Sequence, residues 1–152
     1  MHFLVDLFTN KIFLAPAMAW LCAQVIKIVV DSVRSGFCKE RFVVGGGMPS
    51  SHAATVTGLA IITAAIYGTG SFEFAIALFF GITVICDARG VRYETQRQGR
   101  ALNNLNEERK EEGKQPLDII KFKERIGHSI PELVVGMVIG LVSALIVYHL
   151  PF

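Results

Sequence analysis

Four stretches of this chain are long and nearly free of charge, and the polar residues gather between them. The apolar stretches cover residues 12–33, 52–67, 72–86 and 130–150. A helix that crosses the ~30 Å hydrocarbon layer of a membrane needs about 20 mostly apolar residues. The pattern therefore predicts an all-α integral membrane bundle of about four transmembrane helices, built as a single membrane domain over residues 1–152.

The polar segment 89–126 separates the third apolar stretch from the fourth. Its first part is rich in helix formers, which predicts a helix that continues out of the membrane. Gly113 to Pro116 break that helix. Residues 117–127 then have the spacing of apolar and charged residues expected for a short amphipathic helix that lies at the membrane surface. The first ten residues predict a similar surface helix on the opposite side.

Composition supports a membrane protein and excludes one class of partner. Hydrophobic residues make up 52% of the chain and charged residues only 18%, less charge than a soluble domain usually carries. The net charge of +2 is small, and no basic stretch has interleaved aromatic residues. A nucleic-acid partner is therefore not expected, and membrane lipids are the expected surroundings.

The basic residues are distributed unevenly between the two sides of the predicted bundle. All of them except Lys11 and Lys27 lie in the loops after the first and third apolar stretches. Positive loops usually stay on the cytoplasmic side, so we expect both loops inside and both termini outside. A bacterial inner membrane fits this pattern, and so does a plastid or other organelle membrane.

Polar side chains that hydrophobicity does not explain occur at matching ends of the four apolar stretches. Since successive spans run in opposite directions, these ends meet at one membrane face. Ionisable groups at membrane depth are costly and usually mark function. The residues are Lys27 and Arg34 after the first span, 45–52 before the second, Asp87, Arg89 and Arg92 after the third, and His128 and Glu132 before the fourth.

The segment GGGMPSSH (45–52) has the features of an anion site. Gly47 and its neighbours let the backbone approach a ligand closely, and Ser50 and Ser51 can cap the following helix, whose free N–H groups attract anions. His52 then lies in the first turn, where it can protonate a leaving oxygen. The alternative is a glycine loop and a capped helix with an incidental histidine.

His128 and Glu132 are spaced i, i+4, which places them on one helical face. The carboxylate can fix the imidazole tautomer and leave the other ring nitrogen to attack phosphorus. Lys27 and Arg34 also share a face and can bind one phosphate, although cations that snorkel at a helix end are an equal alternative. Asp87 can ligate a metal, hold Arg92, or cap the helix.

These motifs resemble those of the type-2 phosphatidic acid phosphatase superfamily, which is related to the vanadium-dependent haloperoxidases, and most closely its divergent branch of small membrane proteins. The resemblance extends from Lys27 to Glu132. The matching residues are Lys27 and Arg34 of the first motif, Pro49, Ser50 and His52 of the second, and His128 and Glu132 of the third.

The chain departs from the superfamily pattern at four positions. Ser35 replaces a proline, Ser51 replaces a glycine, and Glu132 replaces an aspartate. Phe122 occupies the place of the arginine that precedes the third-motif histidine. The cations that can replace this arginine are Arg89, Arg92 and Arg125.

The resemblance implies a membrane phosphatase or phosphotransferase that acts on a lipid phosphate or diphosphate without a metal or other cofactor. His128 would be the nucleophile that forms a phosphohistidine, Glu132 its orienting carboxylate, and His52 the general acid. The phosphate-binding set would be Lys27, Arg34, Gly47, Ser50, Ser51, Arg92 and Arg125.

Two other functions remain open from the residues. One is a phosphohydrolase that uses Mg²⁺ or Mn²⁺ bound by Asp87 and Glu132, with His52 and His128 nearby. The other is a non-catalytic membrane protein that uses the same pocket to bind or transport an anion or a lipid. Gly136 and Gly140 form a GxxxG pair, which is compatible with a homo-oligomer that buries this face.

Overall fold

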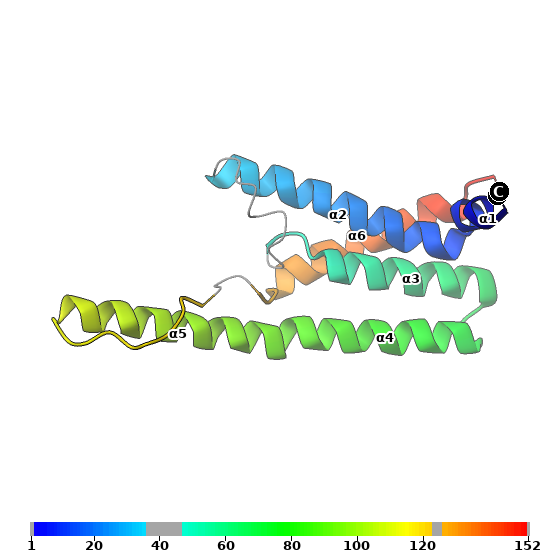
Figure 1. Ribbon diagram of the computed structural model, residues 1–152. Coiled ribbons are helices and arrows are strands. Elements are labelled where there is room, and N and C mark those ends of the chain that lie inside the picture. Colours follow the sequence, from blue (N-terminus) through cyan, green and yellow to red (C-terminus); the bar gives the residue numbers. More distant parts are fainter. Residues whose placement is uncertain (1, 36–46, 123–125, 152) are drawn as a thin grey trace.

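The computed structural model of the chain describes residues 2–35, 47–122 and 126–151, and these form an all-helical bundle with a long arm (Figure 1). The predicted all-α membrane fold is thereby confirmed. The helices are α1 (His2–Thr9), α2 (Lys11–Ser35), α3 (Ser51–Tyr67), α4 (Phe72–Arg89), α5 (Val91–Glu111) and α6 (Ile130–Tyr148).

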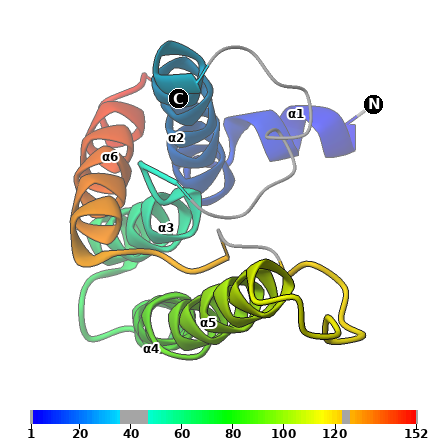
Figure 2. The same ribbon diagram turned by 90° about the vertical axis from the view of Figure 1, so that its left-hand side faces the viewer.

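Helix α3 lies at the centre of the bundle. It contacts α2, α4 and α6, while α2 and α6 also contact each other. A view along the bundle shows α6 on one side of α3, with α2 above it and α4 below (Figure 2). The hairpin at 68–71 joins α3 to α4 at one end of the bundle, and the helix ends that carry the predicted site lie at the other.

Three segments of the described chain are long and apolar enough to cross a membrane. They are Lys11–Val33, the stretch Phe72–Glu111 that combines α4 and α5, and Ile130–Tyr148. The 17-residue helix α3 is also apolar but shorter, and at 1.5 Å per residue it is roughly 25 Å long. Its central position explains how a short, alanine-rich helix is accommodated, because the neighbouring helices cover much of its surface.

Glycines bring α6 and α3 into backbone contact. A Cβ on Gly136 would lie 2.4 Å from the Ser50 carbonyl oxygen, and one on Gly140 would lie 2.4 Å from the Ala54 carbonyl oxygen. Within a membrane, helix association depends on this kind of close packing. The GxxxG face is therefore buried inside the chain, and the homo-oligomer interface suggested from it is already occupied by α3.

Small residues also define the face that α2 presents to the bundle. Ala15, Ala19 and Ala23 follow each other at intervals of four and are fully buried, against Ile62 and Ala54 of α3. The next position in this series is Lys27, which is buried as well. The same helical face therefore changes from small apolar residues to a cation as it approaches the site.

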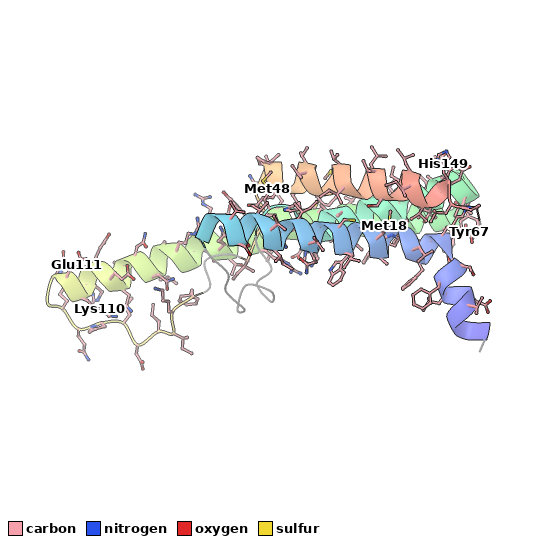
Figure 3. All side chains as sticks on the ribbon, turned by 90° about the horizontal axis from the view of Figure 1, so that it is seen from above. Met18, Met48, Tyr67, Lys110, Glu111 and His149 are labelled. Atoms are coloured by element: carbon pink, nitrogen blue, oxygen red, sulfur yellow. The ribbon has the colours of Figure 1, made fainter. Side chains whose placement is uncertain are left out.

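Helices α4 and α5 form one long rod with a break at Gly90. A Cβ at Gly90 would lie 2.8 Å from the Cys86 carbonyl oxygen, so a larger residue is disfavoured at the break. The 21 residues of α5 extend roughly 31 Å beyond the bundle. Lys110 and Glu111 lie at the tip of this arm, far from Tyr67 and His149 at the opposite end (Figure 3).

After the arm, the chain returns along α5 in a non-helical conformation. The Asn103 amide pairs with both the N–H and the carbonyl of Phe122, at 3.0 Å each, and Asn106 Oδ1 accepts from the Leu117 N–H at 2.7 Å. The amphipathic helix expected over 117–127 is wrong for the described residues 117–122. Asparagine side chains supply the hydrogen bonds that a helix would have made internally.

Near the N-terminus, Lys11 joins the two ends of the chain. Its Nζ donates to the carbonyl oxygens of Tyr148 and Leu150, at 3.0 and 2.7 Å. These carbonyls lie at the C-terminal end of α6, where a cation satisfies unpaired oxygens and interacts favourably with the helix dipole. Helix α1 precedes this contact and projects sideways from the start of α2 (Figure 2).

Candidate functional site

Those polar residues predicted to converge that the structure describes lie at one end of the bundle. Here α2 ends, α3 and α6 begin, and α4 passes into α5 (Figure 1). We call this region the site end, and we define it by Lys27, His52, Arg92 and His128. The antiparallel order of the helices accounts for the convergence, since alternate ends must share a face.

His128 is almost completely enclosed, with 1% of its surface exposed. Its Nδ1 lies 3.1 Å from Glu132 Oε2, and its backbone N–H donates to the Ala88 carbonyl at 3.2 Å. Its Nε2 is buried and has no hydrogen-bond partner among the described residues. A buried polar atom without a partner is rare in proteins and calls for an explanation.

Glu132 holds this histidine and also connects α6 to α3. Its Oε2 accepts from the Ser129 backbone N–H at 3.2 Å, as part of a capping box at the start of α6. Its own carbonyl oxygen accepts from the Ser50 N–H at 3.0 Å. The orientation of His128 is therefore tied to the first turn of α3.

A contact with α5 places the segment that leads into His128. Gln96 is only 8% exposed, and its Oε1 accepts from the backbone N–H groups of both Ile126 and Gly127 at 3.1 Å. A Cβ on Gly127 would lie 2.4 Å from the Cα of Tyr93. Only glycine permits this approach, and the approach fixes how closely the segment before His128 lies against the start of α5.

His52 faces His128 from the first turn of α3. Their ring centroids are 6.2 Å apart, and the ring planes are tilted by 57°. Unlike His128, His52 is exposed. The ionisable groups that act on it are Arg92, His128, Lys27 and Asp87, so most of its charged surroundings are cationic. An anion at this point would be attracted by Arg92 and Lys27.

Lys27 is buried at 5% exposure, and Asp31 and Glu132 are the carboxylates that attract it. Asp31 lies one turn further along the same face of α2. It also lies beside the glycine loop, because a Cβ on Gly47 would be 3.6 Å from its Oδ2. Gly47 has a φ of 110°, a conformation that favours glycine.

Ser50 and Ser51 form the buried start of α3. Ser50 is fully buried, and its Oγ accepts from the Ala53 N–H at 3.3 Å in an N-cap. Ser51 is nearly as enclosed. The cap orders the first turn of the helix, and the N-terminal end of α3 therefore points its positive dipole into the site end.

The arginines proposed for phosphate binding differ in their placement. Arg92 pairs with Asp87 through its Nε, whereas Arg89 lies over the Tyr93 ring at 4.4 Å. Arg34 belongs to α2, but its side chain is outside the described part of the structure, as is all of Arg125. Of Arg89 and Arg92, the two considered replacements for the missing third-motif arginine that the structure describes, Arg92 is the one that acts on His52.

The two carboxylates considered for a metal have other contacts. Asp87 pairs with Arg92, and Glu132 with His128. Within residues 2–35, 47–122 and 126–151, no three His, Cys, Asp or Glu side chains gather in a way that could hold a metal ion.

Two residues of the site end were missed by sequence reasoning. Asp31 could have been identified from the sequence, because it follows Lys27 by four residues within an apolar stretch and therefore lies on the same helical face. Gln96 had none, since nothing local relates it to a segment thirty residues further along the chain. It becomes part of the site only when the chain returns along α5.

Comparison with known proteins agrees with this arrangement. A family model described as "Divergent PAP2 family" matches residues 8–143. An "Uncharacterized membrane protein YuiD" of Bacillus subtilis (strain 168) is 32% identical over 159 residues, covering 95% of this chain and 98% of that protein. No solved structure matches significantly. The chain is a membrane protein that belongs to the divergent PAP2 family.

Proposed function

We propose that this protein is a membrane phosphatase or phosphotransferase that acts on a lipid phosphate or diphosphate through a phosphohistidine on His128. The observation that carries the proposal is the buried Nε2 of His128, which lacks a partner in the described chain while Nδ1 is held by Glu132. With the ring proton on Nδ1, Nε2 presents a lone pair. A phosphoryl group is the partner that this atom would meet in use.

In the first step, the Nε2 lone pair forms a bond to phosphorus as the bond between phosphorus and the leaving oxygen breaks. His52, as the imidazolium, donates its proton to the leaving oxygen, so an alcohol or a phosphate departs. The 6.2 Å between the two ring centroids lets one phosphoryl group contact both rings. Glu132 stabilises the positive charge that develops on His128.

In the second step, water or another acceptor attacks the phosphohistidine. Neutral His52 takes the proton from the attacking oxygen, and the P–N bond breaks to restore His128 with its lone pair. Because Nε2 is enclosed, phosphate reaches it only after neighbouring side chains move. His52 is such a neighbour, and it is exposed.

Charge on the equatorial oxygens would be balanced by Lys27, by Arg92 and by the N-terminal end of α3. Lys27 is buried and therefore acts in surroundings of low dielectric constant, where its charge is worth more than in water. Arg92 already pairs with Asp87, and a phosphate would compete for its guanidinium. We propose that this face is cytoplasmic, on the distribution of basic residues.

A non-catalytic anion- or lipid-binding function is the second candidate, and the position of Phe122 favours it. Phe122 stands where the superfamily has an arginine, and its backbone is held by Asn103. Asn103 lies seven residues beyond Gln96 on α5, or roughly 10 Å further out along the arm. A side chain at position 122 is therefore set away from His128, and position 122 supplies no phosphate ligand.

Phosphate release separates these functions. Purified protein in detergent would be given a panel of lipid phosphates and diphosphates, with and without EDTA. We expect release that survives EDTA and falls by more than about 10³-fold in His128→Ala and by about 10²–10⁴-fold in His52→Ala. Release that depends on added Mg²⁺ or Mn²⁺ would instead support the metal-dependent alternative.

A trapping experiment identifies the nucleophile independently of the release rate. His52→Ala removes the proton donor and acceptor but keeps Nε2, so a substrate with a good leaving group should still phosphorylate His128. Mass spectrometry after an alkaline quench should find the phosphate on His128 and not on His149, a histidine at the other end of the bundle. Saturable binding of lipid phosphates by folded protein, without release or a trapped adduct, would favour the non-catalytic function.

A further inference from the structure

Two apolar cavities follow one another along the same side of α3. One, of about 480 Å³, is lined by Phe13, Pro16, Ala17, Trp20 and Leu21 of α2 together with Thr55 of α3. The other, of about 340 Å³, lies between the start of α2, the second half of α3 and the first half of α4. Both are within the size range of small-molecule sites.

The floor of both cavities is a single stripe of α3. Thr55 lines the first cavity, and Leu59 and Thr63 line the second. These residues are spaced by four, so they lie on one face of the helix. His52 is three residues before Thr55 and shares this face, which makes the exposed histidine the end of the stripe.

The opposite side of α3 is closed by the glycine contacts with α6, whereas this side lies between α2 and α4 (Figure 2). The α2 wall changes character along its length. Positions 13, 17 and 20 are Phe, Ala and Trp, and the same helical face continues through Gln24 to Asp31. The wall is apolar beside the cavities and polar where it reaches the site end.

We propose that these cavities form one groove that holds the hydrocarbon chain of the lipid whose phosphate reaches His52 and His128. This inference rests on the proposed function and deepens it, because it assigns the substrate class. The α3 residues that line the two cavities follow one another along one helix, and the substrate in this proposal is therefore a phosphate on a single long chain that lies lengthwise along α3. From His52 to Tyr67 the groove is roughly 23 Å long at 1.5 Å per residue.

Chain length provides the first test. Straight-chain alkyl phosphates from butyl to hexadecyl would be compared at a constant mole fraction in mixed micelles. We expect kcat/KM to rise by about tenfold or more from the shortest to the longest chain, because each added methylene gains contact in the groove. An isoprenyl phosphate of equal length, run beside the series, distinguishes acyl-like from isoprenoid chains, and preference for either one supports the groove.

A variant that fills the groove provides the second test. Ala17→Phe adds bulk to the wall of the larger cavity, away from the buried Ala15 and Ala19 stripe. We expect kcat/KM for hexadecyl phosphate to fall by about tenfold, with that for butyl phosphate unchanged within about twofold. The matched control is Val138→Phe, at a position of α6 that is 54% exposed, and it should change neither value.

Trp20 provides a binding measurement that does not require turnover. It is the only tryptophan of the chain, it lines the groove, and it is 48% exposed. A hexadecyl phosphate brominated along its chain should quench Trp20 fluorescence in a saturable way. Unlabelled hexadecyl phosphate should reverse the quenching, while hexadecanol and phosphatidylcholine should not, because only a phosphate anchors the chain at the site end.

The two readouts separate failure of the groove from failure of the proposed function. Saturable, phosphate-dependent quenching without turnover would support the groove and count against catalysis. Turnover that is indifferent to chain length, or that Ala17→Phe reduces equally for butyl and hexadecyl phosphate, would overturn the groove and leave catalysis standing. Quenching that phosphatidylcholine reverses equally well would show that bulk lipid covers this face. Loss of Trp20 quenching when the protein dimerises would show that a second copy covers it. Either result would overturn the proposal.

Discussion

The two sides of helix α3 are built in opposite ways. On the side of α6, Gly136 and Gly140 bring backbone against backbone, with no room for a Cβ. On the side between α2 and α4, Thr55, Leu59 and Thr63 border apolar cavities. Helix α3 thus has a closed side, where its backbone contacts α6 directly, and an open side, where cavities leave space for a ligand.

This difference extends to the two histidines. His128 belongs to the closed side, since Glu132 of α6 orients its ring and also hydrogen-bonds to Ser50 of α3. His52 belongs to the open side and is exposed. A nucleophile needs a fixed position and a proton donor needs access to arriving and departing groups, so the contrast matches the roles that we propose.

Filling the closed side should have the largest effect. Gly140→Val would drive a side chain into the Ala54 carbonyl, and we expect the free energy of unfolding to fall by more than about 3 kcal/mol. Reversible unfolding in SDS measures this. Leu59→Phe on the open side is the control and should cost less than about 1 kcal/mol. Equal losses in the two variants would mean that the two sides do not differ.

Moving the nucleophile without touching it should have the next largest effect. In Gly127→Ala, the added Cβ meets the Tyr93 backbone at 2.4 Å, so the segment that carries His128 must shift. A displacement of about 1 Å can cost on the order of 10²-fold in rate, and we expect phosphate release to fall by that amount. Gly70→Ala, where nothing lies within 4 Å of the new Cβ, should be silent.

Removing the support beneath that segment should have a smaller effect. Gln96→Ala leaves the N–H groups of Ile126 and Gly127 without their shared acceptor, and we expect kcat to fall by about 10- to 100-fold with KM nearly unchanged. Gln96→Glu keeps an acceptor oxygen and should recover most of kcat. If both variants lose kcat and stability in parallel, Gln96 is merely structural and does not position His128.

A change remote from both sides should have the smallest effect. Lys11→Met removes the cation from the end of α6, where it donates to Tyr148 and Leu150. We expect a loss of about 1 kcal/mol in unfolding free energy and no change in kcat. Lys11→Arg keeps the charge and should restore stability. A change in kcat would show that the two ends of the bundle are coupled, which the contrast between the closed and open sides of α3 does not predict.

Much of the fold was predictable because its signals are local. Apolar stretches of sufficient length identify α2, α4 and α6, and the polar run after α4 indicates the arm. The exception is 117–122, where amphipathic spacing predicted a helix. Asn103 and Asn106 hold this segment to α5 instead, and hydrogen bonds from a distant helix leave no mark on local periodicity.

The sequence by itself determined which residues share an end of the bundle. Alternating spans place Lys27, His52, Arg92 and His128 at one face, whatever the details of packing. The four-residue spacing of His128 and Glu132 also predicted their contact, but the prediction that both lie on one helical face is wrong: His128 precedes α6, and the capping box at Ser129 turns Glu132 back so that its Oε2 lies 3.1 Å from His128 Nδ1. The shared end of the bundle thus depends only on chain direction, whereas the contact between His128 and Glu132 depends on how α6 is capped.

The tertiary structure decided which residues far apart in the sequence contact one another. It turned Gly136 and Gly140 toward α3 rather than toward another copy, brought Gln96 under the segment before His128, and left Nε2 buried without a partner among the described residues. It also left one side of α3 open between α2 and α4. Such features arise from contacts between residues far apart in the chain, whose choice of partner depends on the packing of whole helices and not on any local pattern.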